Sequence, residues 1–184
     1  NEYCSSIQKD QQNIFYLSGE RIEELYNSPF LERINDNEII VLLLTDTMDE
    51  YLVKKIKQYR GLNFIDITNE NIEIIIDDEQ SVQDFIEVEQ FYKNILVDIQ
   101  KLLENGVDDV RISRRLTNSP CILLTQNGGL SPNMERITRT KYSFEECSKN
   151  LKKRILEINP NHILTHALYE LHTDSTLSFE NLAK

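Results

Sequence analysis

The sequence predicts an α/β unit followed by an α+β unit, and three observations lead to this fold class. Short apolar segments alternate with helix-period segments over residues 1–75, and one long amphipathic pattern follows them. Charge is also uneven, with 7 Lys/Arg and 20 Asp/Glu in residues 1–92 but 13 and 11 in residues 93–184. Alternating strands and helices indicate right-handed β-α-β crossovers. The charge asymmetry indicates two units with different surfaces.

The first unit is predicted to be a small parallel β-α-β-α-β sheet. The unbroken apolar run Ile39–Leu44 is typical of a strand buried on both faces. Asp46 or Thr47 can cap the helix that follows it, and Gly61 can end that helix. The predicted strands are Ile14–Leu17, Glu38–Leu44 and Asn63–Ile67, and the predicted helices are Glu20–Tyr26, Phe30–Ile34 and a helix from Asp46 or Thr47 to Tyr59.

Residues 76–82 are predicted to connect this unit to a second one, residues 83–184, that mixes helices with a short sheet. Its first helix carries a long apolar stripe and stops at Gly106. The predicted helices are Val82–Asn105, Leu130–Thr140, Phe144–Leu156, one starting at Asn159 and one near Ser178, and the predicted strands are Val107–Leu116 and Cys121–Thr125.

Composition limits the classes of function. The 184 residues carry a net charge of −11, which argues against nonspecific binding to nucleic acid as the main role. No apolar run approaches the roughly 20 residues of a membrane-spanning helix. Three widely spaced cysteines without a C-x-x-C pair indicate neither a zinc site nor a disulfide framework. Without an initiator Met or a signal peptide, the chain is expected to be an excised piece of a longer protein.

A nucleotide site is not predicted, because neither G-x-G-x-x-G nor a Walker A sequence is present. Asp46 follows the most apolar strand, where open α/β folds place functional groups. One alternative function is therefore a small α/β enzyme or phospho-receiver that uses Asp46. A receiver also needs an acidic pair after the first strand and a Lys after the last, and Ser18-Gly19 and Thr68-Asn69 do not supply them. We favour a helix-capping role for Asp46.

Other candidate groups have ordinary structural interpretations. His162 and His166 are four residues apart, as metal ligands on one helix face would be, but no third ligand is evident and no metal site is predicted. Cys121 is expected to be an inert buried thiol. Residues 111–154 contain 10 Lys/Arg and 3 acidic residues, and this basic region is interpreted as solvated faces rather than an anion site or a scaffold surface.

Leu130, Met134 and Ile137 form an apolar stripe at positions i, i+4 and i+7. Pro132 and two glycines before it would keep the segment loosely attached, and Met recurs at adaptable binding surfaces. The stripe is therefore either an interaction surface or one face of a core helix. Spacing alone favours the core helix.

Several strings, in order, resemble the heat shock protein 90 chaperone family. Each is weakly specific by itself, but together they cover the chain from Tyr3 to its end. The strings are Gln12–Glu20, Ser28–Arg33, Asp49–Tyr51, Arg115–Cys121, Asn133–Ile137 and Leu156–His162.

The resemblance implies that residues 1–75 are the last α/β part of the middle domain and residues 83–184 the C-terminal domain without its last dimerisation helices. The parent protein would then be an ATP-hydrolysing, homodimeric chaperone of the stress response that uses ATP and Mg²⁺. This chain would lack the nucleotide-binding and catalytic residues. It would relay nucleotide-driven changes and exist as a monomer or weak dimer.

The resemblance also implies a site for unfolded or partly folded client proteins, with cochaperones as possible partners and neither nucleic acid nor membrane. The client-binding residues would be Glu50, which adds polarity at the rim, and Tyr51, Leu130, Met134 and Ile137. In place of the family's Gly-Trp stands Gly129-Leu130, and the stretch from Ile137 to Leu156 is shorter than in cytosolic members. Arg114–Leu116 and Arg154–Glu157 resemble bacterial and organellar members, which favours a mitochondrion or plastid over the cytoplasm.

Overall fold

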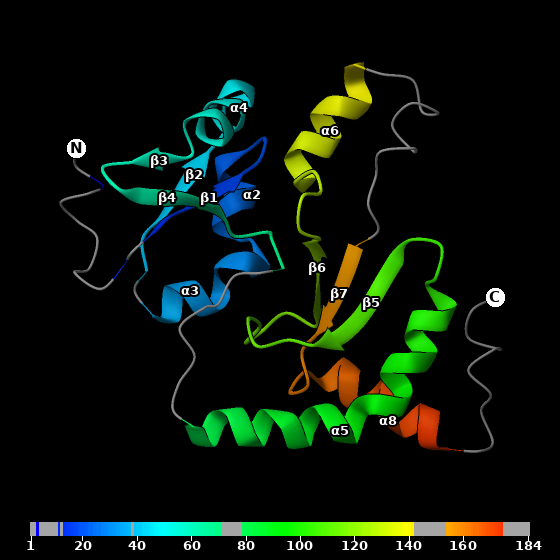
Figure 1. Ribbon diagram of the computed structural model, residues 1–184. Coiled ribbons are helices and arrows are strands. Elements are labelled where there is room, and N and C mark those ends of the chain that lie inside the picture. The colour runs from blue at the N-terminus through cyan, green and yellow to red at the C-terminus, as the bar shows by residue number, and fades with distance from the viewer. Residues whose placement is uncertain are drawn as a thin grey trace. The chain divides into compact units, whose positions relative to one another are not determined.

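A computed structural model describes Tyr3, Gln11 and residues 13–37, 39–70, 79–141 and 154–174. The chain forms two compact units, and each combines two separate stretches of sequence. The first contains residues 1–72 and 125–152, and the second contains residues 73–124 and 153–184. Helices accompany a sheet in both units, which confirms the predicted α/β and α+β classes (Figure 1).

The first unit is built on a four-stranded sheet in the order β2-β1-β4-β3. The central strand β1 pairs with both β2 and β4, and these pairs are parallel, as predicted. The strand β3 adds an antiparallel edge beside β4. The strands are β1 (Asn13–Ser18), β2 (Val41–Leu44), β3 (Gln58–Tyr59) and β4 (Leu62–Asp66).

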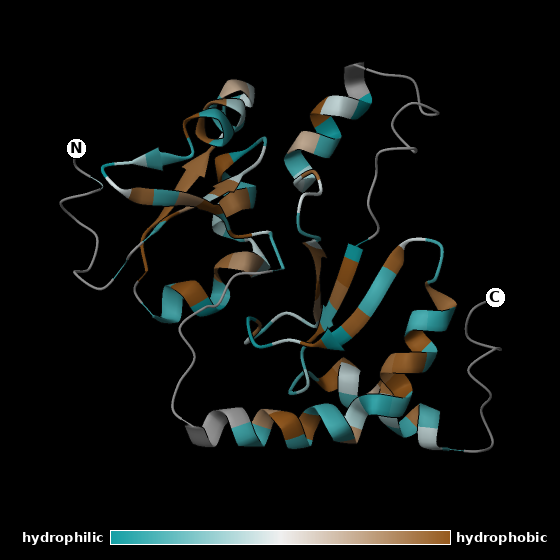
Figure 2. Ribbon diagram, viewed as in Figure 1, coloured by the Kyte–Doolittle hydropathy of each residue, from teal (hydrophilic) through white to brown (hydrophobic). Residues whose placement is uncertain are grey.

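Burial in this sheet is greatest at β1. Ile14, Tyr16 and Leu17 are almost fully buried, and Figure 2 shows the strongly hydrophobic colour of this part of the sheet. The prediction that the apolar run ending at Leu44 is buried on both faces is wrong. β2 lies at the edge of the sheet, and all four of its residues are only half-buried.

The helices between β1 and β3 follow the predicted order, and they add Leu25, Leu31, Ile34 and Val53 to the core of the first unit. Among the described residues, the helices of this unit are α2 (Ile22–Tyr26), the 3-10 turn η1 (Pro29–Leu31), α3 (Glu32–Asp36), α4 (Thr47–Ile56) and α6 (Pro132–Lys141).

The end of α4 differs from the prediction. The helix stops at Ile56 rather than Tyr59, because Lys57 adopts a φ of 64° and turns the chain into β3. Gly61 does not end the helix. It has a φ of 83° in the turn between β3 and β4, a conformation that glycine adopts without steric cost.

Where the structure describes it, the second unit combines a three-stranded sheet in the order β5-β7-β6 with two helices. Its elements are α5 (Glu79–Leu102), β5 (Val107–Ile112), β6 (Cys121–Thr125), β7 (Arg154–Ile158) and α8 (Ile163–Thr173). Arg154–Leu156, predicted to end a helix, instead belong to β7, which pairs in parallel with β5. Residues 144–153 of that predicted helix and the helix near Ser178 lie outside the described residues.

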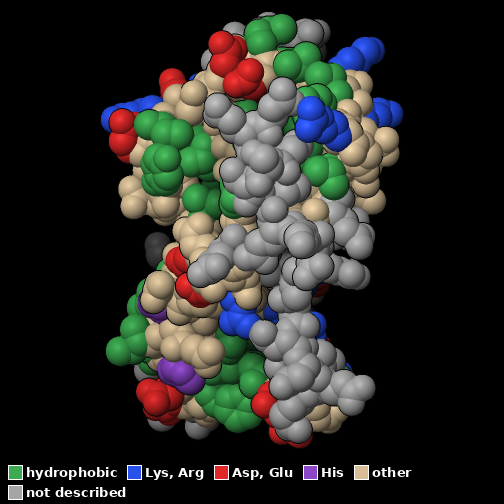
Figure 3. All heavy atoms as spheres, turned by 90° about the vertical axis from the view of Figure 1, so that its left-hand side faces the viewer, with side chains coloured by type: hydrophobic (Ala, Val, Ile, Leu, Met, Phe, Trp, Pro, Cys, Tyr) green, Lys and Arg blue, Asp and Glu red, His purple; other side chains and the backbone are tan. Residues whose placement is uncertain are grey.

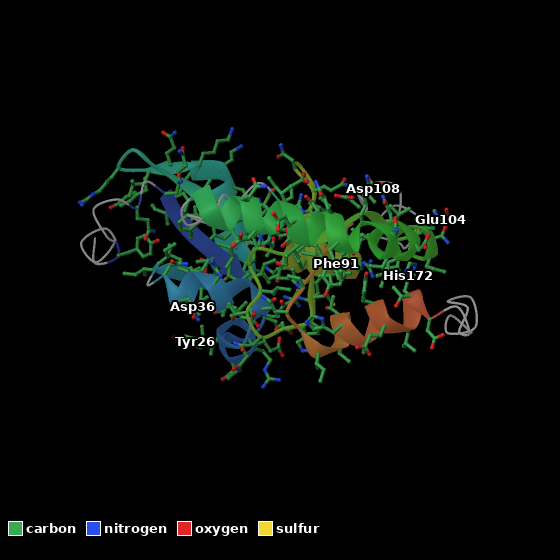
Figure 4. All side chains as sticks on the ribbon, turned by 90° about the horizontal axis from the view of Figure 1, so that it is seen from below. Tyr26, Asp36, Phe91, Glu104, Asp108 and His172 are labelled. Atoms are coloured by element: carbon green, nitrogen blue, oxygen red, sulfur yellow. The ribbon has the colours of Figure 1, made fainter. Side chains whose placement is uncertain are left out.

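The core of the second unit lies between α5 and the sheet. Tyr92, Ile95 and Leu96 of α5 pack with Val110 and Ile158 of the strands. On α8, Tyr169 stacks on Phe91 of α5, which is labelled in Figure 4, with 4.4 Å between the ring centroids. Within the part of the chain that is described, the helices are too short or too polar to cross a membrane.

Candidate functional site

The helix α4 begins at a well-formed cap and presents two different faces. The carboxylate of Asp46 accepts a hydrogen bond from the backbone N–H of Met48 (2.8 Å), the geometry of an N-cap. Two acidic residues follow in the first turn, and Lys54 and Lys55 lie in the last turn, so the side-chain charges complement the helix dipole. The capping role predicted for Asp46 is confirmed.

One face of α4 is apolar and exposed. Met48 is 65% exposed and Tyr51 is 40% exposed, and Leu52 and Ile56 are also exposed. These residues lie at helical positions i, i+3, i+4 and i+8, so they share one side of the helix. Hydrophobic side chains exposed among charged ones are visible on the face of the molecule drawn in Figure 3. We call Met48, Tyr51, Leu52 and Ile56 the α4 patch.

The opposite face of α4 buries the ionised side chain of Glu50, whose exposure is 0%. Ser18 Oγ donates to Oε2 at 2.5 Å, and Asn133 Nδ2 donates to the same oxygen at 3.1 Å. Ser131 Oγ donates to Oε1, and Lys54 Nζ lies 2.8 Å from that oxygen. Glu50 therefore joins α4 to β1 and to the start of α6.

These donors decide the charge state of Glu50. Burial by itself would raise the pKa of the carboxyl group, since it penalises the charged form. Hydrogen bonds from Lys54, Ser131 and Ser18 outweigh burial, and the pKa is lowered below its ordinary value. Glu50 is thus a carboxylate at neutral pH.

The start of α6 is shaped by a turn and a cap. Gly128 adopts a φ of 72°, and a Cβ on Gly129 would lie 3.0 Å from the backbone oxygen of Gln126, so both glycines suit this tight turn. Ser131 then caps α6, because its Oγ accepts from the N–H of Met134 at 3.1 Å.

The turn before α6 is anchored to the segment that follows β4. Thr125 N–H donates to the Thr68 carbonyl (2.8 Å), and Glu70 N–H donates to the Thr125 carbonyl (3.0 Å). The Glu70 carboxylate also accepts from Asn127 N–H at 2.6 Å. Residues distant in sequence thereby hold α6 in the first unit.

The structure places the five client-binding residues predicted from the resemblance in the first unit, in different environments. Tyr51 is exposed and Leu130 is half-buried, whereas Met134 and Ile137 are 6% and 5% exposed. Glu50 was expected at a rim, but its side chain is fully buried. The sequence analysis did not predict its partners Ser18, Ser131 and Asn133. The only local signal for any of them is Ser131 directly before Pro132, a pattern typical of a helix start.

A shallow pocket of about 350 Å³ lies beside the carboxyl ends of β1 and β4. Tyr16, Lys54 and Asp66 line it together with the turn at Gly128 and Gly129. Burial raises the pKa values of Tyr16 and Asp66, the latter despite two hydrogen bonds from Thr68. Sequence reasoning did not predict this pocket.

The remaining candidate groups have structural roles. His162 caps α8 through Nδ1, which accepts from Leu164 N–H (3.1 Å), and His166 Nδ1 lies 3.3 Å from the Tyr92 hydroxyl. No cluster of three metal-ligating side chains occurs among the residues that the structure describes. The expectation that Cys121 is buried is wrong, since its side chain is exposed.

Part of the basic region is neutralised internally. Glu157 of β7 is buried, and its carboxylate lies 3.0 Å from Arg111 and 3.6 Å from Arg115, which is itself buried. Ser113 Oγ donates to the same carboxylate at 2.9 Å. These two arginines therefore serve an internal ion network and not an open cationic face.

Comparison with known sequences assigns the chain to a family. The profile of the family described as "Hsp90 protein" matches residues 1–181. The chain belongs to the Hsp90 protein family, which confirms the resemblance. It is 38% identical to an "Endoplasmin homolog" of Catharanthus roseus over 175 residues, which is 92% of this chain and 21% of that protein.

Other relatives come from bacteria and a chloroplast. The chain is 32% identical to the "Chaperone protein HtpG" of Bdellovibrio bacteriovorus, covering 88% of this chain and 26% of that protein. It is 33% identical to the "Heat shock protein 90-5, chloroplastic" of Arabidopsis thaliana, covering 88% and 21%. The chain thus spans only about 21–26% of the length of these relatives.

Proposed function

We propose that this chain is the client-binding section of an Hsp90-type molecular chaperone and that it holds unfolded or partly folded proteins through apolar contacts. The observation that carries the proposal is the α4 patch. Its four large apolar side chains share one face of a short, well-capped helix and remain exposed. Exposed apolar surface of this kind is typical of a protein–protein contact.

The chemistry of the patch suits unselective recognition. Met48 supplies a flexible thioether that can adapt to side chains of different shape, and Tyr51 supplies a rigid ring with a polar end. The patch contains no buried polar group that would select one partner. We expect weak binding and fast exchange of clients, with Leu130, Met134 and Ile137 extending the contact when they are accessible.

The parent protein, on this proposal, is a homodimeric chaperone that uses ATP and Mg²⁺ elsewhere in its sequence, and this section relays nucleotide-driven changes to the client. Support comes from membership of the Hsp90 family and from the relative named as a chaperone protein. We also propose an organellar location, supported by the chloroplastic relative, although the HtpG relative is bacterial.

The test is suppression of the aggregation of a heat-denatured model client, followed by light scattering. We expect Tyr51→Ala combined with Leu52→Ser to reduce protection severalfold, since the variant removes the centre of the α4 patch. Tyr26→Ala is the matched control, because Tyr26 is a 67% exposed aromatic residue of α2 in the same unit. Circular dichroism checks that each variant is folded.

Equal protection by the wild type and the α4 patch variant would show that this site is wrong. Equal loss in the Tyr26→Ala control would show that general surface hydrophobicity, not the α4 patch, holds the client. The variant Met134→Ala, tested in parallel, reports whether α6 also contributes.

A further inference from the structure

Two residues of the apolar stripe are buried on α6, the helix whose start binds Glu50. Met134 and Ile137 are nearly fully buried, although the family resemblance assigns them to client contact. A residue cannot contact a client while it is buried, so α6 must move before this stripe can be used. The contacts of Glu50 show what opposes that movement.

We propose that Glu50 is the latch that holds α6 closed, and that Met134 becomes accessible only when the hydrogen bonds from Ser131 and Asn133 to Glu50 break. Glu50 is then a positioning residue, acting through α6. The accessibility of Met134 stands independently of client binding, whereas the consequence for clients rests on the proposed function.

The geometry divides the four donors of Glu50 into two sets. Lys54 and Ser18 belong to α4 and β1 and stay beside the carboxylate whatever α6 does. Ser131, which caps α6, and Asn133 of α6 lie 81 and 83 residues further along the chain than Glu50. Breaking only the second set frees the start of α6 from Glu50, while Lys54 and Ser18 keep the carboxylate in place.

The charge of Glu50 makes these two hydrogen bonds stronger than ordinary ones. Hydrogen bonds to an ionised acceptor are roughly twice as strong as those between neutral groups. A second link between α6 and the rest of the first unit, Arg136 to Glu20 at 3.1 Å, joins two exposed side chains, and such pairs contribute little. Glu50 is therefore the dominant polar contact among these.

The same charge makes the latch reversible. A buried carboxylate is stable only while donors surround it. When α6 leaves, water can replace the two lost donors, and Lys54 and Ser18 still hold the carboxylate. Opening therefore costs less than it would if Glu50 stayed buried without partners.

The chain offers an internal reporter, because it contains only two methionines. Met48 is 65% exposed and Met134 is 6% exposed. Hydrogen peroxide oxidises methionine to the sulfoxide by transfer of one oxygen atom to sulfur, with water as the other product. Peptide mass spectrometry then gives both rates in one sample, and the ratio of the Met134 rate to the Met48 rate measures opening of α6.

The key variant is Asn133→Ala, which removes one latch donor and leaves the Ser131 cap intact. We expect Met134 to oxidise roughly tenfold faster, with the Met48 rate unchanged. The reason is that losing a hydrogen bond to a charged group shifts an equilibrium by about tenfold or more. Arg139→Ala is the matched control, because it breaks an exposed pair within α6, to Glu135, and does not touch Glu50. Glu50→Gln is a second variant that keeps the shape of the side chain.

An unchanged Met134 rate in both Asn133→Ala and Glu50→Gln, or an equal rise in Arg139→Ala, would overturn the latch. If Met134 becomes reactive but binding of fluorescein-labelled, reduced and carboxymethylated lactalbumin does not tighten, the control of client access is overturned. Failure of the wild type to bind that probe would count against the proposed function alone. Met134 oxidation is measured without a client, so it still tests the latch.

Discussion

Glu50 links the stability of the first unit to pH. Its folded-state pKa is lowered, so its stabilising effect is fully present above the unfolded pKa of about 4.5 and is lost as pH falls through the lower folded value. We expect wild type to be more stable than Glu50→Gln in urea unfolding at neutral pH. The difference should shrink only below about pH 4.5.

The groups that face Glu50 do not reverse the direction of this pH dependence of stability. Lys54 Nζ lies 2.8 Å from the carboxylate, and Ser18, Ser131 and Asn133 carry no titratable group. Asp66 interacts electrostatically with Glu50, and burial raises the pKa of the Asp66 carboxyl group. Protonation of Asp66 as pH falls removes a repulsion from Glu50, so it leaves the direction of the effect unchanged. A difference that instead grows toward acid pH would contradict the assignment of Glu50 as a stabilised carboxylate.

Glu157 allows a second test at the scale of one residue. Glu157→Ala would leave the buried Arg115 without this carboxylate, and we expect a loss of about 3 kcal/mol in the free energy of unfolding. Lys101→Ala, which breaks the exposed pair with Asp98, should cost less than about 1 kcal/mol. If chemical denaturation shows equal losses of unfolding free energy in the two variants, the Glu157 network stabilises the fold no more than an exposed ion pair does.

At the scale of elements, the cap of α4 should control the α4 patch. Removing the N-cap carboxylate in Asp46→Ala should cost about 1 kcal/mol, because the N–H of Met48 loses its acceptor. Asp49→Ala is the control, since Asp49 lies in the first turn without being the cap residue. Hydrogen exchange of the α4 amides should rise in the first variant more than in the second.

Sequence patterns predicted the elements whose signals are local. The strand at Ile14–Leu17 and the cap at Asp46 were both predicted, because an apolar run between breakers and an Asp before a helical pattern are short-range features. Lys57 carries no signal for a positive φ, so the early end of α4 was missed. The segment Arg154–Leu156 shows the ambiguity of short apolar runs between helix and strand.

The candidate site was less predictable than the elements. The exposure of Tyr51 follows from which face of α4 packs, and that depends on the partners of the helix. The burial of Glu50 depends on Ser131 and Asn133, more than 80 residues away. A helix-period pattern cannot indicate contacts at such separation.

At the scale of the whole molecule, the net charge of −11 should affect which clients bind fastest. Apolar contact with the α4 patch is insensitive to moderate salt, whereas long-range attraction is screened over about 10 Å at 0.1 M salt. We expect association with a positively charged unfolded client to slow as salt rises. Association with a negatively charged client of equal length should not slow, and stopped-flow fluorescence distinguishes the two.

The division of the first unit between two stretches of sequence has a consequence for synthesis. Glu50 leaves the ribosome 81 residues before Ser131. At the usual 5–20 residues per second, this interval lasts about 4–16 s. During it α4 and β1 can form, but Glu50 has only Lys54 and Ser18 as partners and α6 does not yet exist. Every newly made chain therefore passes through a period in which the Glu50 carboxylate lacks its donors from Ser131 and Asn133.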